Sequence, residues 1–300
     1  MVAVSGRMEH RAYPRIPQKL AADTGGPWVA TEKLHGANLV VAFDGARVRI
    51  GKRKAWLADD EAFFGWQLLR ASLEASVVSV WKTLSVSRNV RLHGELIGGA
   101  YPGLPSLPGL SAVQTGCWYD PGLRFVTFDV VVDETFLAHS ELGALGLEVV
   151  PLLGRGTRGE LEKLPVIFES TYAVSRGLPR VPRNFAEGYV LKPDARWWTS
   201  DRPIVKRKHP DFDDARFDDS KAWAPRRSLR DDEWLILAAL LVNPARLASA
   251  RSKIGEDAAL IADEVALDVL VDLEAVQPWA FNLLDDDHMD WLRSEIVKLC

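Results

Sequence analysis

The sequence predicts an α+β fold, with a first domain built on antiparallel β-sheets and a small all-helical domain after it. Short runs rich in valine, isoleucine and aromatic residues recur through the first two thirds, separated by Gly, Pro, Asp or Asn. The regular strand–helix alternation of a parallel sheet is missing. After Pro225 the pattern changes to helical periodicity. We therefore expect domains at residues 1–222 and 223–300.

Seven segments of the first domain have strand character, and two have helical character. Apolar residues at helical spacing predict a helix over 61–84, and a second is expected over 140–145. The expected strands are WVATEKL (28–34), NLVVAF (38–43), ARVRI (46–50), NVRLHGELI (89–97), LRFVTFDVVV (123–132), GYVLKP (188–193) and PIVKRK (203–208).

Four helices are expected in the second domain. Ser228 is placed to cap the first, DDEWLILAALL, whose acidic residues lie in the first turn as the helix dipole favours. Asn243 and Pro244 supply a cap and a first-turn proline for the second. The third is expected from about 256 to 274, and the fourth over MDWLRSEIVKL, residues 289–299.

Composition is that of a soluble globular protein with an uneven charge distribution. Of the 300 residues, 47% are hydrophobic and 26% charged, and the two cysteines suggest neither a disulfide framework nor a zinc site. We find no signal peptide or membrane span, so we expect a cytoplasmic protein. Residues 228–300 carry 6 Lys and Arg against 15 Asp and Glu, a net charge of −9, whereas residues 1–227 have a net charge of +5. The first part is therefore expected to attract a polyanion and the second to repel one.

Five ordered stretches carry the candidate chemistry. In TEKLHGAN (31–38), Lys33 ends an apolar strand, and a glycine three residues later lets the backbone turn beside a ligand. Alone, KxxG is common, and a solvated lysine before a turn is the default interpretation. The other stretches are HGELIGG (93–99) with Glu95, FVTFDVVVD (125–133) with Phe128 and Asp129, AEGYVLKP (186–193) with Glu187 and Lys192, and IVKRKHP (204–210), where Lys206 and Lys208 face one side of a strand.

In this order the stretches resemble the signature motifs of the covalent nucleotidyltransferase superfamily: KxxG, a Glu strand, FD, EGxVxK and KxK. The details resemble most the RNA ligase 2 family, which includes the kinetoplastid RNA-editing ligases: EKLHG with Asn38 close behind, GKR at 51–53, GELIGGAYPG and VQTGCWY. DNA ligases and capping enzymes usually carry KxDG. The resemblance covers about residues 10–212 and implies an ATP-grasp-like nucleotidyltransferase domain.

The resemblance implies an ATP-dependent RNA ligase that works through Lys33-AMP, with Mg²⁺ or Mn²⁺ as the metal. A lysine attacks phosphorus only as the free amine, and its ordinary pKa is about 10.4. Partial burial and neighbouring cations would have to lower the pKa of Lys33. The candidate cations are Arg53, Lys206, Lys208 and the metal. The two strand lysines would also stabilise charge that develops on the phosphate oxygens.

The remaining roles also come from the resemblance, position by position. Glu95 would hold the ribose hydroxyls, Phe128 would stack on adenine, and Glu187 would help bind the metal. Glu32 would help recognise adenine or be solvated, and Arg53 would contact the 5′-phosphate of the RNA. Three further roles stay open: Lys192 contacts ATP phosphates or the RNA backbone, His35 acts as a base, orients Lys33 or contacts substrate, and Asn38 belongs to the same motif.

The expected substrate is RNA with 5′-phosphate and 3′-hydroxyl ends, in a nicked duplex, as in RNA repair. The alternatives are an ATP-dependent DNA ligase or capping-type nucleotidyltransferase, and a catalytically inactive RNA-end-binding protein. DNA ligases and capping enzymes append a β-rich oligonucleotide-binding domain, whereas RNA ligases of the RNA ligase 2 type end in helices, as this chain does. The acidic helical domain is expected to grip RNA at Arg246, Arg251 and Lys253, or to contact a protein partner.

Overall fold

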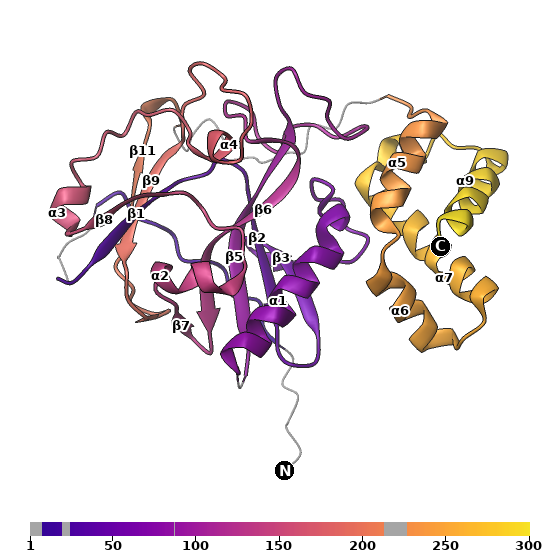
Figure 1. Cartoon of the computed structure of the whole chain (residues 1–300), viewed down its shortest axis with the longest axis horizontal. Coiled ribbons are helices and arrows are strands. Elements are labelled where there is room, and N and C mark those ends of the chain that lie inside the picture. The colour runs from indigo at the N-terminus through magenta and orange to yellow at the C-terminus, as the bar shows by residue number, and fades with distance from the viewer. Residues whose placement is uncertain (1–7, 20–24, 87, 213–226) are drawn as a thin grey trace, which may run out of the picture. The chain divides into compact units, whose positions relative to one another are not determined.

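The computed structural model describes residues 8–19, 25–86, 88–212 and 227–300. Two antiparallel sheets and a helical C-terminal region confirm the predicted α+β class (Figure 1). The predicted boundary after residue 222 lies outside the described residues and stays a prediction. Contacts between Cα atoms divide the chain into two compact units, of which the first is Met1–Leu57, Glu74–Leu96 and Phe125–Asp218, and the second is Ala58–Leu73, Ile97–Arg124 and Asp219–Cys300.

The smaller sheet lies in the first unit and has four strands in the order β11-β9-β1-β8. Its neighbours pair antiparallel, so that Val190 lies opposite Thr31 on one side and Lys206 on the other. Trp28, Tyr189 and other buried side chains form its core. The strands are β1 (Trp28–Glu32), β8 (Leu152–Gly156), β9 (Gly188–Pro193) and β11 (Val205–Lys208).

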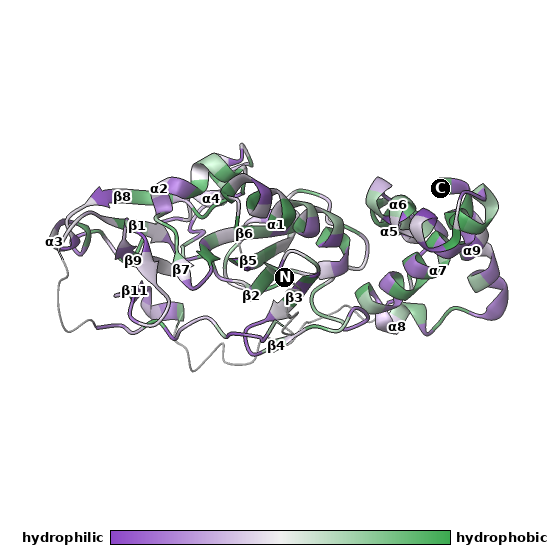
Figure 2. Ribbon diagram, turned by 90° about the horizontal axis from the view of Figure 1, so that it is seen from below, coloured by the Kyte–Doolittle hydropathy of each residue, from purple (hydrophilic) through white to green (hydrophobic). Residues whose placement is uncertain are grey.

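The larger sheet has seven strands in the order β10-β7-β6-β5-β2-β3-β4. Strand β2 is largely hydrophobic (Figure 2) and pairs with β5 so that Asn38 lies opposite Glu95. Two candidate site residues are thereby fixed side by side. The strands are β2 (Ala37–Phe43), β3 (Val48–Lys52), β4 (Ala55–Trp56), β5 (Val90–Ala100), β6 (Asp120–Val132), β7 (Thr135–Phe136) and β10 (Trp197–Trp198).

The two predicted helices of the first domain form, with shifted ends. The first is a 3₁₀ turn, η1 (Trp66–Leu69), continued by α1 (Arg70–Leu84), and the second is α2 (His139–Leu142) followed by η2 (Gly143–Leu145). The sequence did not predict three short helices of the first domain, which are α3 (Arg158–Leu161), α4 (Tyr172–Ser175) and η3 (Pro210–Phe212).

The C-terminal helices are α5 (Asp231–Leu241), α6 (Pro244–Ile254), α7 (Ala258–Val276), α8 (Pro278–Phe281) and α9 (Asp286–Leu299). Asn243 caps α6 as predicted, because its side chain accepts a hydrogen bond from the Arg246 N–H at 3.0 Å. The predicted Ser228 cap is wrong. Helix α5 begins three residues later, and the Glu233 carboxylate accepts from the Arg230 N–H at 3.0 Å instead.

None of the helices among the described residues is by itself both long and apolar enough to cross a membrane, although α5 and α6, which meet at a bend of 72°, pass the test of length and composition as a pair.

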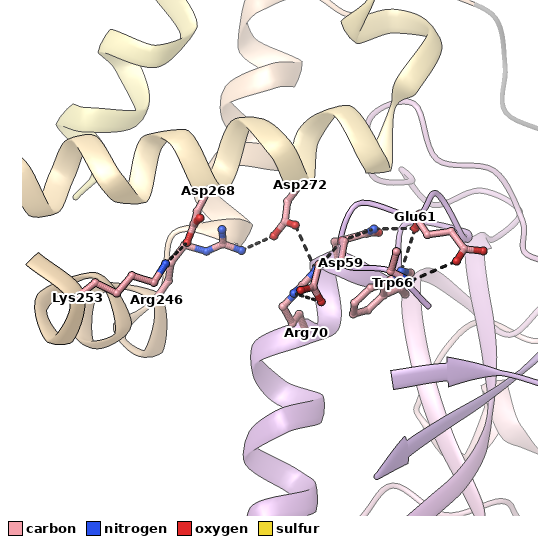
Figure 3. Close-up of polar contacts among 10 residues, drawn as sticks. Asp59, Glu61, Trp66, Arg70, Arg246, Lys253, Asp268 and Asp272 are labelled. Carbon is pink, nitrogen blue, oxygen red and sulfur yellow. Dashed lines mark hydrogen bonds and ion pairs between the residues drawn. The ribbon is translucent and has the colours of Figure 1, made fainter. Parts of the chain in front are cut away.

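The second unit joins the C-terminal helices to the segment that precedes α1. Leu68 packs against the apolar core of helices α5, α6, α7 and α9. Asp272, a buried carboxylate on α7, accepts from Arg246 and lies 3.5 Å from an Arg70 guanidinium nitrogen. Arg70 also donates to Asp59 at 3.0 Å (Figure 3). Residues 58–73 therefore pack with the C-terminal helices in one compact unit, whereas the predicted boundary at residue 222 assigns them to the first domain.

Candidate active site

A pocket of about 650 Å³ opens in the first unit, between residues of both sheets. Eight of the predicted site residues line it: Glu32, Lys33, Asn38, Arg53, Glu95, Phe128, Lys192 and Lys206. The other three, His35, Glu187 and Lys208, do not line the pocket; Glu187 contacts Lys33, and His35 and Lys208 contact Glu187.

Lys33 and Glu187 form the centre of the site. The Lys33 Nζ donates to Glu187 Oε2 at 2.6 Å. The other carboxylate oxygen, Oε1, lies 2.9 Å from Lys208 Nζ, and His35 Nδ1 lies 3.5 Å from Oε2. Three basic side chains from β11 and from the segment after β1 therefore converge on one buried carboxylate.

The backbone explains why these elements meet at Glu187. The Lys33 N–H donates to the Gly188 carbonyl and the His209 N–H to the Glu187 carbonyl, both at 2.9 Å. Gly188 has a φ of +136°, and a Cβ at this position would lie 2.0 Å from the Arg207 carbonyl oxygen. Only glycine lets β9 and β11 approach so closely, which gives the EG pair of the motif a steric reason.

Electrostatics keep the Glu187 carboxylate ionised. Burial alone would raise its pKa, but Lys33, with His35 and Lys208, lowers the pKa far below its ordinary value. The same attraction acts on the amine, because a carboxylate at 2.6 Å stabilises the ammonium form of Lys33. The sequence predicts a ring of cations around Lys33, but its nearest charged partner is an anion.

Glu95 has the opposite behaviour. It lines the pocket from β5, and burial there raises its pKa to about 7, although Lys33 lowers it and Glu187 raises it further. Glu95 and Glu187 thus interact electrostatically across the site, and their environments push the two pKa values apart. One carboxylate stays ionised, and the other titrates near neutral pH.

Lys192 belongs to a second buried cluster below the pocket. Its Nζ donates to Asp129 Oδ1 at 2.8 Å and to the Phe128 carbonyl. Arg202 holds the same Asp129 carboxylate at 2.7 Å. Burial would raise the pKa of Asp129, but Arg202 and Lys192 lower it below its ordinary value. The FD motif and the lysine of EGxVxK therefore meet as an ion pair.

Glu32 and Phe128 are fixed by their neighbours. The buried Glu32 carboxylate accepts from the Ser170 hydroxyl at 2.5 Å and from the Thr171 hydroxyl at 2.6 Å. It is therefore not a solvated side chain, and burial raises its pKa. Phe128 packs edge-on against Tyr13, with ring centroids 5.0 Å apart.

The N-terminal segment contributes to the pocket, although no sequence motif indicates it. Residues Ala12 to Ile16 line the pocket, as does Lys54 beside the predicted Arg53. The Tyr13 hydroxyl donates to Asp129 Oδ2 at 2.5 Å, across 116 residues of sequence. The only signal in the sequence was an aromatic residue among basic ones in HRAYPRI, which by itself fixes no position.

The donor set limits how a metal ion would be held. The described residues contain no group of three or more His, Cys, Asp or Glu side chains arranged to bind a metal. Glu187 and Glu95 offer hard oxygen donors, and Mg²⁺ commonly takes one or two carboxylates, keeping water and phosphate oxygens as its other ligands. The residues present fit an ion that arrives with a nucleotide, and do not fit a cage made only of protein ligands.

A strand-end lysine, two carboxylates and several cations around one pocket make a site for a phosphate-bearing ligand. A sequence model of the RNA ligase family matches residues 26–208, and the chain belongs to that family. It is 32% identical to the mitochondrial RNA-editing ligase 2 of Trypanosoma brucei brucei, with 55% of this chain and 48% of that protein covered. The chain thus spans about half the length of this curated relative.

Solved structures of a Naegleria gruberi RNA ligase are also similar. A mutant with ATP and Mn has a TM-score of 0.43 and 16% identity, covering 71% of this chain and 58% of that one. The ligase with PPi has a TM-score of 0.41 and 18% identity, covering 65% and 52%.

Proposed function

We propose that this protein is an ATP-dependent RNA ligase that seals 5′-phosphate and 3′-hydroxyl ends through Lys33-AMP. The observation that carries the proposal is the position of Lys33 in the pocket, in contact with Glu187 and beside the lysines of β11. Family membership and the identity with an RNA-editing ligase support RNA as the substrate.

In the first step, the Lys33 amine attacks the α-phosphorus of ATP. The N–P bond forms, the P–O bond to the β-phosphate breaks, pyrophosphate leaves, and the amine gives up a proton. Because Glu187 stabilises the ammonium in the unliganded protein, this proton must be lost when the nucleotide binds. Lys206, which lines the pocket, and Lys208 would stabilise the charge that develops on the phosphate oxygens.

A divalent cation is expected to act with ATP, as it does generally in phosphoryl transfer. Glu187 would hold it, with Glu95 as the second available carboxylate. When bound, the metal supplies positive charge, which would weaken the hold of Glu187 on the Lys33 ammonium. We propose Mg²⁺, with Mn²⁺ as a substitute.

Two further steps complete the proposed cycle. An oxygen of the RNA 5′-phosphate attacks the AMP phosphorus, which breaks the Lys33 N–P bond and forms a 5′-5′ pyrophosphate. The 3′-hydroxyl then attacks the RNA phosphorus, loses its proton and releases AMP, leaving a 3′-5′ phosphodiester. A nicked duplex would hold both ends in line for this attack.

The pocket-lining residues take the roles that the family motifs suggest. We propose that Glu95 binds the ribose hydroxyls and that Phe128 stacks on adenine. Glu32 lies beside Lys33 in a fixed orientation, which suits recognition of the base. Asn38, opposite Glu95, and His35, against Glu187, would orient the nucleotide and Lys33 respectively.

Lys192 has a more indirect role in this proposal. Its ammonium is engaged by Asp129, so we propose that it balances the charge of the pocket floor while it faces the nucleotide phosphates. The alternative of a contact with the RNA backbone suits a buried, ion-paired side chain less well.

The test is adduct formation with α-labelled ATP and magnesium. We expect label on the protein, none on Lys33→Ala, and wild-type labelling of Lys163→Ala, which removes an exposed lysine of the same unit. Label that persists on Lys33→Ala would refute the assignment. Labelling by GTP, or equal sealing of all-DNA nicks, would favour the capping-type or DNA ligase alternative, and tight binding of nicked RNA without any adduct would favour an inactive RNA-end binder.

For the helical C-terminal region, which lies outside the family match, we propose a protein partner. The basic residues expected to grip RNA are engaged by carboxylates: Arg246 by Asp272, Arg251 by Glu256 at 3.1 Å, and Lys253 by Glu264 at 3.0 Å. Figure 3 shows two of these cations, Arg246 and Lys253, turned toward acidic residues of α7.

The exposed side of α7 suggests what the partner offers. Leu260, Leu267 and Val271 are about half exposed and follow one another at spacings of seven and four, with Glu264 and Glu274 in the same row. A cationic amphipathic helix would match this row. We expect a Lys/Leu heptad peptide to bind the full chain, and Leu267→Ser/Val271→Ser to weaken that binding; equal binding of a scrambled peptide would refute the surface.

A cytoplasmic location stays a prediction, and the matched trypanosome protein is mitochondrial.

A further inference from the structure

The N-terminal segment is fixed along the pocket at three points. The His10 Nε2 lies 2.9 Å from the Lys52 carbonyl oxygen, and its ring meets the Trp56 ring edge-on at 4.9 Å. The Tyr13 hydroxyl is held by Asp129, and the Pro17 carbonyl accepts from the Lys206 N–H at 2.9 Å. The residues between these points, including Arg15, are therefore held at the pocket wall.

The turn between β3 and β4 presents two more cations to the same pocket. Lys52 pairs with Ala55, so the turn consists of Arg53 and Lys54 alone. Such a short connection between paired strands leaves little backbone freedom. Both side chains line the pocket, and His10 joins this hairpin to the segment that carries Arg15.

Arg15, Arg53 and Lys54 differ from the deeper cations of the pocket. All three are exposed, and none forms a side-chain hydrogen bond or an ion pair within the described ranges. Lys33 and Lys192, in contrast, are each held by a buried carboxylate. Arg53 interacts electrostatically with Glu95 in the pocket, but three exposed cations gathered around one opening without an ion pair create a positive potential that attracts an anion.

We propose that Arg15 and Lys54 join Arg53, for which the family motifs already imply a phosphate contact, in a phosphate-binding subsite at the rim of the pocket. This inference rests on the proposed function and extends it, because Lys33 and the β11 lysines already account for the α-phosphate. The ligand is a phosphate group that is not part of AMP. Its source is either the pyrophosphate that leaves ATP or the 5′-phosphate of the RNA, and both suit a guanidinium fork beside an ammonium.

The experiment compares the steps of ligation in Arg15→Gln/Lys54→Gln. One arm follows discharge of labelled enzyme-AMP by pyrophosphate, and the other follows AMP transfer from that enzyme to 5′-phosphorylated RNA without ATP. We expect a loss of roughly tenfold or more in one arm, as for removal of charge-assisted contacts. A loss in the first arm identifies pyrophosphate as the ligand, and a loss in the second identifies the RNA end.

Arg47→Gln is the matched control, since it removes an exposed cation that does not line the pocket. Thermal unfolding midpoints equal to wild type ensure that the double variant is folded. If both arms stay within about twofold of this control, or if both fall equally, the subsite is refuted.

Equilibrium binding tests the phosphate-binding subsite without requiring that the protein form Lys33-AMP. Inorganic pyrophosphate, 5′-phosphorylated RNA and 5′-hydroxyl RNA are titrated against the full chain carrying Lys33→Ala, with and without the rim substitutions. We expect the rim substitutions to weaken binding of pyrophosphate, or to remove the preference for a 5′-phosphate over a 5′-hydroxyl. These results need no adduct, so they stand or fall independently of Lys33-AMP.

Discussion

The pocket and the helical C-terminal region use charge in opposite ways. Six cations and three carboxylates line the pocket, and three of the cations, Arg15, Arg53 and Lys54, form no ion pair among the described residues. Residues 228–300 contain 15 acidic and 6 basic residues. Every one of those six cations forms an ion pair with a carboxylate of its own region.

The comparison shows that the capacity to bind an anion depends on which cations are left without a partner. The whole chain is acidic, with a net charge of −4, and this value predicts no nucleic-acid partner. The local arrangement does favour one. Exposed cations attract a polyanion at the pocket. In the helical region, the cations form ion pairs with carboxylates of the same region, and further carboxylates are exposed.

Burial separates the two regions as well, and Asp129→Asn tests this with the largest expected effect on stability. The substitution leaves Lys192 and Arg202 buried beside a neutral amide, which costs roughly 3–5 kcal/mol for a buried ion pair that loses one partner. We expect the urea midpoint of the first unit to fall accordingly.

The control for this prediction is Asp263→Asn, which breaks the half-exposed pair with Arg293 in the helical region. A pair of this kind contributes about 0–1 kcal/mol, so little change is expected. Similar losses in the two variants would contradict the distinction between buried and exposed charge pairs.

Glu95 gives a smaller and pH-dependent effect. Burial raises its pKa to about 7 from an ordinary value of 4.5, so the folded state binds the proton more tightly than the unfolded state. The resulting stability is fully present below pH 4.5 and is lost as the pH rises to 7. Glu95→Gln stays neutral, and should gain on the order of 1–2 kcal/mol over wild type across this range, after allowance for solvent in the pocket.

Urea unfolding at pH 4.5 and pH 7.5 measures this change. Glu9→Gln, which alters an exposed carboxylate of the same unit, serves as the control. A difference between wild type and Glu95→Gln that is the same at both pH values would contradict the raised pKa.

The sequence was sufficient where a feature depends on residues close together in the chain. The strand that ends just before Lys33, the cap at Asn243 and the long apolar helices follow from local patterns, and the structure confirms them. Two-residue strands such as β4, β7 and β10 were missed, because segments this short show no alternating pattern; β4 and β7 pair with the strands just before them, and β10 pairs with β7, about 60 residues earlier. The predicted cap at Ser228 is wrong because α5 begins at Asp231. The backbone N–H of Arg230, the residue before the helix, donates instead to the carboxylate of Glu233 within the first turn.

The candidate site shows the same limit more sharply. Ordered motifs identified the residues around Lys33, but the order carries no information on which charges touch. The partner of Lys33 is Glu187, 154 residues away, and Tyr13 reaches Asp129 across 116 residues. Contacts of this kind depend on the pairing of β1 with β9 and on the path of the N-terminal segment. Neither the strand pairing nor this path can be predicted from one sequence alone.

The smallest expected effect is that of removing cations from the helical region. Arg251→Gln/Lys253→Gln removes two half-exposed cations that are ion-paired with Glu256 and Glu264. Because these cations are already neutralised, RNA affinity and its salt dependence should stay within about twofold of wild type. Arg53→Gln, in contrast, removes an exposed pocket cation that forms no ion pair among the described residues, and the slope of log K against log salt should fall by about 1. Filter binding of 5′-phosphorylated RNA between about 50 and 200 mM salt measures both slopes. If the helical double variant loses as much slope as Arg53→Gln, its ion pairs open to bind RNA, and the contrast between the two regions would be one of the unliganded state alone.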